Sequence, residues 1–166
     1  MNDSPPALTP TQLGAYFALI EVSSLVRHAV EQQLREAGDL SYVQFQLLAR
    51  LGDAPSGSHR MTDLADGVVY SRSGLTYQAQ SLEERGLVTR APSLEDERSV
   101  TVTITAAGRE VLTRVFPGHI GLLEDQLFAP LSGEDVESMS EVLGRVRDHL
   151  RATPPRSAAS RRRKLI

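Results

Sequence analysis

Cysteine is absent from the 166-residue sequence. Disulfide bonds, thiolate metal sites and thiol redox sensing are therefore excluded, and any sensing must use other chemistry. The sequence also lacks a basic start followed by an apolar block, and we expect none of its apolar runs to be long enough to cross a bilayer. These absences favour a cytoplasmic protein without a membrane-spanning segment.

Motifs for catalysis are missing as well. The sequence contains no glycine-rich phosphate loop, nucleophile elbow or paired-carboxylate motif, so it does not indicate an enzyme. Its histidines lie in different predicted elements and lack the spacing of metal ligands, so we expect surface or half-buried side chains and no metal or cofactor. These histidines are His28, His59, His119 and His149.

Positive charge is also scarce, because 18 Lys and Arg residues stand against 21 Asp and Glu residues and leave a net charge of −3. Nucleic-acid binders usually carry an excess of positive charge, since their phosphate contacts release counterions. Between residues 58 and 104, five arginines are outnumbered by seven acidic residues. A nucleic-acid interface in this chain must therefore depend on where its cations are placed.

Apolar residues make up 40% of the chain, enough for one ordinary core with some extra helices. Near the N-terminus Thr9 fits an N-cap, Pro10 the first helical position and Gln12 the capping-box partner. A helix is therefore predicted over about 9–37, with Gly38 as its terminator. We expect residues 1–8 and the basic tail 153–166 to be disordered.

The middle of the sequence predicts three further helices and a hairpin. Ser41 and Gln44 cap the first of these helices, residues 54–60 form an exposed loop, and Thr62 caps a short third helix. A fourth helix follows Ser71, with a core face of Leu75, Ala79 and Leu82, and ends at Gly86. Two runs rich in β-branched residues then flank the loop "SLEDER", which predicts a β-hairpin.

The C-terminal part predicts two more helices. Thr105 caps the fifth, which we expect to be kinked near Pro117-Gly118 and to resume as far as Phe128. Ser132 and Asp135 suggest a capping box for the sixth, whose apolar residues alternate spacings of three and four. The apolar faces of the first and last helices exceed what one small domain needs to cover itself, which predicts a homodimer. The residues assigned to that surface are Leu13, Phe17, Ile20, Val136, Met139, Leu143, Val146 and Leu150.

This order of elements, with the segments "LADGVVYSRSGLT", "LEERGLVTR", "DER" and "VTVTITAAGREVL", resembles the MarR family of bacterial transcription regulators. The resemblance implies a mainly α fold with a small β-hairpin (α+β): a winged helix-turn-helix core at about 41–105, flanked by dimerisation helices at about 9–37 and 105–152. It also implies that the fourth helix enters the major groove of DNA and the hairpin, or wing, the minor groove. The chain departs from many relatives at Tyr77 and Gln78, where an arginine is common, so base preferences do not transfer.

The candidate DNA-binding residues combine a polar helix face with the wing. The start of the fourth helix offers hydrogen-bond donors and one charge to phosphate, and its polar face can reach base edges. In the wing, a carboxylate two residues from an arginine can hold the guanidinium towards a narrow, negative minor groove. We assign these roles to Arg60, Ser71, Arg72, Ser73, Thr76, Tyr77, Gln80, Arg90, Asp96 and Arg98.

An effector site is expected from the same resemblance, because many relatives release DNA on binding small aromatic or phenolic acids in a cleft between the dimer helices and the winged domain. Arg27 and His28 would bind the carboxylate, and Tyr42 and Phe45 would form the apolar wall, although core packing explains the two aromatics equally well. The protein is thus predicted to be a homodimeric repressor of a pseudo-palindromic operator, released by a small ligand.

Two alternatives stay open at this stage. A wing with one Asp and one Arg is also what a solvated turn with a surface ion pair would contain, and the basic run at 161–164 is either a solvated tail or an arm with nonspecific phosphate affinity. The alternative function is a winged-helix module for protein contacts without specific DNA readout, since a fold does not dictate a function.

Overall fold

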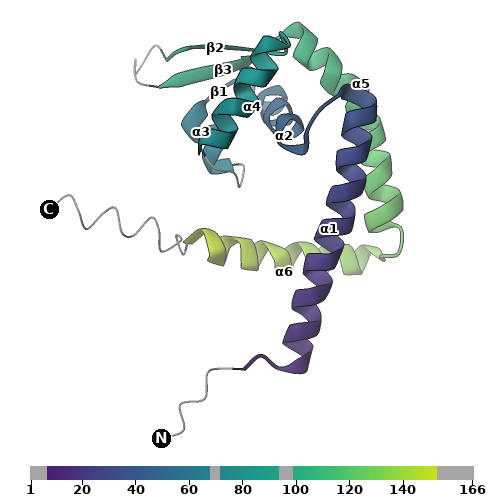
Figure 1. The fold of residues 1–166 in the computed structure, drawn as a ribbon. Coiled ribbons are helices and arrows are strands. Elements are labelled where there is room, and N and C mark those ends of the chain that lie inside the picture. The colour runs from purple at the N-terminus through teal and green to yellow at the C-terminus, as the bar shows by residue number, and fades with distance from the viewer. Residues whose placement is uncertain (1–6, 68–71, 94–98, 153–166) are drawn as a thin grey trace, which may run out of the picture. The chain divides into compact units, whose positions relative to one another are not determined.

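The computed structural model describes residues 7–67, 72–93 and 99–152 of the chain (Figure 1). Contacts divide the chain into two compact units, the first ending at Glu124 and the second beginning at Asp125. The architecture is mostly helical with a small antiparallel sheet, which confirms the predicted fold class. In chain order the elements are α1 (Pro10–Gly38), α2 (Tyr42–Asp53), β1 (Ser58–Arg60), α3 (Met61–Gly67), α4 (Arg72–Glu84), β2 (Val88–Pro92), β3 (Val100–Ile104), α5 (Ala106–Leu123), the π-helical turn η1 (Glu124–Phe128) and α6 (Gly133–Ala152).

Helix starts follow the predicted caps closely. Reciprocal capping boxes join Thr9 to Gln12 at α1 and Ser41 to Gln44 at α2. The hydroxyl of Ser132 accepts from the backbone N–H of Asp135 and donates to its carboxylate, which lowers the pKa of Asp135. The predicted cap at Thr62 is wrong, because α3 already begins at Met61.

Gly38 has a different role from the one predicted. The left-handed residue that ends α1 is Asp39, with φ of 50°, and its N–H bonds back to the carbonyl of Arg35. Gly38 is buried, and a Cβ there would lie 2.6 Å from Cγ2 of Val115. It is therefore a packing glycine that lets α1 approach α5 closely, and these two helices run side by side in Figure 1.

The sheet contains a strand that the sequence did not predict. β1 pairs antiparallel with β3, which pairs on its other edge with β2, giving the order β1-β3-β2. Residues 57–60 are thus not the exposed loop we expected: Gly57 is buried, and the hydroxyls of Ser58 and Thr103 lie 2.7 Å apart. Three residues are too few to show strand alternation, so only the pairing with β3 defines them as a strand.

The core of the first unit forms where α1, α2, α4 and α5 meet the sheet. Leucines dominate it, and the predicted core face of α4 is confirmed. In α5 the helix continues through Pro117 to Leu123, and the irregular segment comes later, as the π-helical turn η1. The fully buried large residues are Leu34, Leu40, Leu47, Leu48, Leu51, Leu64, Leu75, Leu82, Val88, Val102 and Val115.

Helix α1 is long and apolar enough, by length and composition alone, to cross a membrane, which contradicts our expectation about apolar runs. Most of its apolar stretch is not buried within the chain. Length and composition alone do not distinguish a membrane span from the core helix of a soluble protein or a signal sequence. The C-terminal half of α1 buries Val30 and Leu34 in the core of the first unit, so its unpartnered apolar surface is N-terminal.

Candidate nucleic-acid interface

Helix α4 has one face in the core and one in solvent. Leu75, Ala79 and Leu82 are at most 1% exposed, whereas Tyr77 on the opposite face is 69% exposed. Beside it are three more exposed polar residues of α4: Ser73, Gln80 and Glu84. The amide Nε2 of Gln80 donates to Oε1 of Glu84 at 3.3 Å, a weak bond along an exposed face. The solvent face of α4 therefore presents hydrogen-bonding groups, while the opposite face packs in the core.

The predicted contacts at the N-terminal end of α4 are described only in part. Ser73 and Thr76 are exposed in its first turns, as the phosphate and base-edge roles require. Ser71, Asp96 and Arg98 lie outside the described residues, and so does the side chain of Arg72. Their assignment as DNA contacts stays a prediction.

The described part of the wing is a regular antiparallel pair of strands as far as Ser93 and Ser99. Val88 pairs with Ile104 and Arg90 with Val102, and the N–H of Ser93 donates to the carbonyl of Ser99 at 2.8 Å. Within β3, Val102 and Ile104 are buried, whereas Val100 is exposed. The strands thus place Ser93 and Ser99 beside each other at the same end of the sheet.

Arg90 joins the wing to α4. Its Nε and Nη2 both lie 2.7 Å from Oε2 of Glu83, and its backbone N–H donates to Oε1 of the same carboxylate at 3.0 Å. These bonds, led by the side-chain hydrogen bond, lower the pKa of Glu83. The guanidinium of Arg90 therefore forms an ion pair that positions β2 against α4. The sequence did not reveal this pair, because its two residues belong to different secondary-structure elements.

The remaining predicted cation, Arg60, ends β1 on the edge of the sheet. It pairs in register with Thr101 and is half-buried. The end of the wing is also fixed to the end of α4: Gly86 has the positive φ (71°) of a helix terminator, and its carbonyl accepts from the hydroxyl of Thr105 at 2.7 Å. Helix, turn and wing are thus held as one rigid element.

The four candidate effector residues do not converge. The guanidinium of Arg27 lies 5.4 Å from the ring centroid of Tyr42 and bonds Glu31 at 3.0 Å, whereas His28 is exposed. Phe45 is buried and instead packs against His119, with ring centroids 4.7 Å apart. Burial lowers the pKa of His119. The core-packing alternative therefore describes Phe45, and only Arg27 and Tyr42 are brought together.

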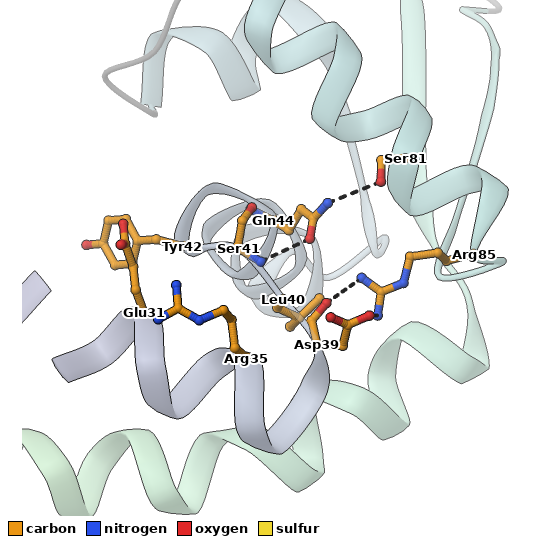
Figure 2. Close-up of a pocket in the computed structure, with 9 residues that line it drawn as sticks. All are labelled: Glu31, Arg35, Asp39, Leu40, Ser41, Tyr42, Gln44, Ser81 and Arg85. Atoms are coloured by element: carbon orange, nitrogen blue, oxygen red, sulfur yellow. Dashed lines mark hydrogen bonds and ion pairs between the residues drawn. The ribbon is translucent and has the colours of Figure 1, made fainter. Parts of the chain in front are cut away.

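A groove of about 460 Å³ lies where α1, α2 and α4 meet (Figure 2). On its α4 side, Arg85 donates to the carbonyls of Gly38 and Asp39, and Ser81 accepts a hydrogen bond from Gln44. Sequence reasoning did not identify these residues, because their partners are about 40 positions away. The groove is lined by Glu31, Arg35, Asp39, Leu40, Ser41, Tyr42, Gln44, Ser81 and Arg85.

Apolar surface remains uncovered within each unit. On α1, Leu13, Phe17 and Ile20 are exposed, Phe17 to 62%. On α6, Leu143, Val146 and Leu150 are exposed, and Val136 and Met139 are half-exposed. Surfaces of this extent are typical of protein contacts rather than of a solvated monomer.

Comparison with known proteins is consistent with this geometry. The model of the MarR family matches residues 38–99. The HTH-type transcriptional regulator PecS of Dickeya dadantii is 30% identical over 134 residues, covering 80% of this chain and 79% of PecS. The HTH-type transcriptional regulator MhqR of Bacillus subtilis is 30% identical over 105 residues, covering 63% of this chain and 68% of MhqR.

Two solved structures from Streptomyces coelicolor have the same fold. Sco3205, a MarR family transcriptional regulator in complex with DNA, superposes with a TM-score of 0.84 at 31% identity, covering 90% of this chain and 93% of that one. AbsC, another MarR family transcriptional regulator, superposes with a TM-score of 0.83 at 28% identity, covering 89% and 99%.

Proposed function

The chain belongs to the MarR family of transcription regulators, and we propose that it is a repressor that binds an inverted-repeat DNA operator as a homodimer. The observation that supports this most strongly is the solvent face of α4, where Tyr77 and Gln80 are exposed while the opposite face is buried. The similarity to PecS, MhqR and Sco3205 is to transcription regulators rather than to enzymes.

Helix α4 acts as the recognition helix in this proposal. Thr76, Tyr77 and Gln80 face base edges in the major groove, and Ser71, Arg72 and Ser73 bind phosphate at its N-terminal end. Arg98 of the wing, held by Asp96, enters the minor groove. Arg60 adds positive charge at the end of β1, and Arg90 would contact DNA from β2 while its charge is balanced by Glu83. This placement offsets the low net charge of the chain.

The homodimer is proposed from the uncovered apolar residues of α1 and α6. Leu13, Phe17 and Ile20 on α1 and the α6 residues from Val136 to Leu150 would be covered by a second copy of the chain. A two-fold dimer places two recognition helices in successive major grooves, so the operator should be an inverted repeat with half-sites about 10 base pairs apart. A soluble dimer of this kind acts in the cytoplasm.

A small aromatic or phenolic acid is proposed as the effector that releases DNA. Support comes from the stacked pair of Arg27 and Tyr42, which joins a cation to an aromatic surface beside the groove. His28 is exposed near this pair along α1, whereas Phe45 would contribute only from the core. The effector carboxylate would compete with Glu31 for Arg27.

The test is selection of bound fragments from a random genomic pool, followed by gel-shift titration of the selected sequence over a range of salt concentrations. A DNA-binding repressor should show one preferred inverted repeat and a steep loss of affinity with salt. The alternative, a winged-helix module for protein contacts, predicts neither a preferred sequence nor a steep salt slope.

A further inference from the structure

A third face of α4 is occupied by polar contacts to the junction of α1 and α2. Nε2 of Gln44 donates to Oγ of Ser81 at 3.3 Å, and the Ser41 hydroxyl donates to Oε1 of Gln78 at 3.4 Å. Arg85, the residue that follows α4, continues this row one turn beyond Ser81 (Figure 2). At 100° per residue, this face lies roughly 100° round the helix from the solvent face with Tyr77. It therefore contacts protein, not the DNA that the solvent face would meet.

Arg85 makes the strongest of these contacts. Its Nη1 donates to the carbonyl of Asp39 at 2.7 Å and its Nη2 to the carbonyl of Gly38 at 3.1 Å, with the Asp39 carboxylate 3.8 Å from Nη2. Both carbonyls lie at the C-terminal end of α1, where helix carbonyls lack intrahelical partners and carry partial negative charge. A guanidinium matches this pair because its planar fork donates two bonds in fixed directions. We call this contact the Arg85 fork.

The Arg85 fork connects the recognition helix directly to the helix we assign to dimerisation. The other contacts of α4 fix it to the winged domain itself, through Leu75 and Leu82 in the core and through Glu83 to Arg90 on β2. The end of α1 is rigid, because Gly38 packs against Val115 of α5 and the carbonyl of Ala37 accepts from Nε of Arg114 at 3.0 Å. Beyond the apolar core that α1 and α4 share, the Arg85 fork is thus a directional polar contact between the end of α4 and the end of α1.

We propose that Arg85 is a positioning residue that sets the spacing between the two operator half-sites, without itself contacting DNA. This inference rests on the proposed function, because half-site spacing has meaning only for a dimer on an inverted repeat. One base pair changes the separation of the half-sites by about 3.4 Å. A recognition helix held to α1 by a directional fork resists that displacement, whereas one held only to the winged domain can follow it.

The test compares operators that differ only at their centre. The selected inverted repeat is prepared with its natural spacing, with one base pair inserted and with one deleted, and affinities are measured by fluorescence anisotropy. The parent protein should bind both altered operators more weakly. In Arg85→Ala this spacing penalty should fall by about tenfold, the factor expected for one charge-assisted hydrogen-bonded contact. Base discrimination within each half-site should be unchanged.

Arg114→Ala is the matched control, because it removes one positive charge and one bond to the same end of α1 without touching α4. It should keep the spacing penalty of the parent even if its melting temperature falls as far as that of Arg85→Ala. Arg85→Lys keeps the charge but not the fork, so it should lose most of the penalty; it decides the matter if Arg85→Ala does not fold.

Three results would overturn the inference. An unchanged spacing penalty in both Arg85 variants would make Arg85 a stability residue only. A loss of affinity that is equal at all spacings, with a salt slope shallower by about one, would make it a phosphate contact. Equal affinity of the parent protein for all three operator spacings would mean that the dimer does not fix the half-site separation. Failure of the parent to select any inverted repeat would instead refute the proposed function, and the inference with it.

Discussion

Replacing Gly38 by alanine should destabilise the protein although alanine is the better helix former. Alanine in place of a helical glycine contributes up to about 1 kcal/mol of stability. At Gly38, however, the new Cβ would lie 2.6 Å from Cγ2 of Val115, which is fully buried, and 3.5 Å from Cδ1 of the buried Leu40. Overpacking of this kind costs about 1 to 3 kcal/mol. We therefore expect Gly38→Ala to lower the free energy of unfolding by up to about 2 kcal/mol.

Gly14→Ala on the same helix is the matched control, because no atom lies within 4 Å of the Cβ that would be added there. It should raise the free energy of unfolding by about 0.5 to 1 kcal/mol. Both variants are measured by urea denaturation at equal protein concentration, with sedimentation to confirm an unchanged assembly. Equal effects at the two positions would show that α1 and α5 do not approach each other as closely as the structure indicates.

The other predictions concern the wing, the dimer and one ion pair. Arg98→Ala should weaken binding to all operator variants similarly and make the salt dependence shallower, whereas Gln80→Ala should change the penalty for particular base changes by roughly 1 to 3 kcal/mol in competition titrations. The reverse pattern would exchange the roles of wing and helix. Replacing Leu143 and Val146 together by Asp should give monomers or insoluble protein, and an unchanged dimer in sedimentation would contradict the assignment of α6. Arg90 lowers the pKa of Glu83, so folding favours the ionised carboxylate. The parent should therefore be more stable than Glu83→Gln above the ordinary pKa of a glutamate. This stability advantage should be lost as the pH falls through the folded-state pKa of Glu83. A difference between the two proteins that does not change with pH would contradict it.

The elements that the sequence predicted well are those with local signals. Thr9, Ser41 and Ser132 each precede a capping partner by three residues, and all three helices begin there. The helical spacing of Leu75, Ala79 and Leu82 likewise predicted which face of α4 is buried. Such patterns lie within one turn or one helix, so a single chain is enough to read them.

The features that the sequence did not reveal depend on residues far apart in the chain. β1 exists because it pairs with β3, more than 40 positions later. Gly38 looked like a terminator, but its packing against Val115 explains it and Asp39 takes the left-handed conformation. Arg85 was not singled out in the sequence, and its contacts became evident only when the structure placed the end of α1 beside it. Arg90 was predicted to contact DNA, and its ion pair with Glu83 became evident only when the structure placed β2 beside α4.

The most direct test of the whole account is footprinting of the parent protein on the operator that it selects. A dimer with two recognition helices should protect two half-sites related by two-fold symmetry, with centres about 10 base pairs apart. Protection should disappear in parallel at both half-sites as salt is raised. Protection of a single half-site would contradict the dimeric docking, and protection that does not depend on sequence would contradict specific repression by this protein.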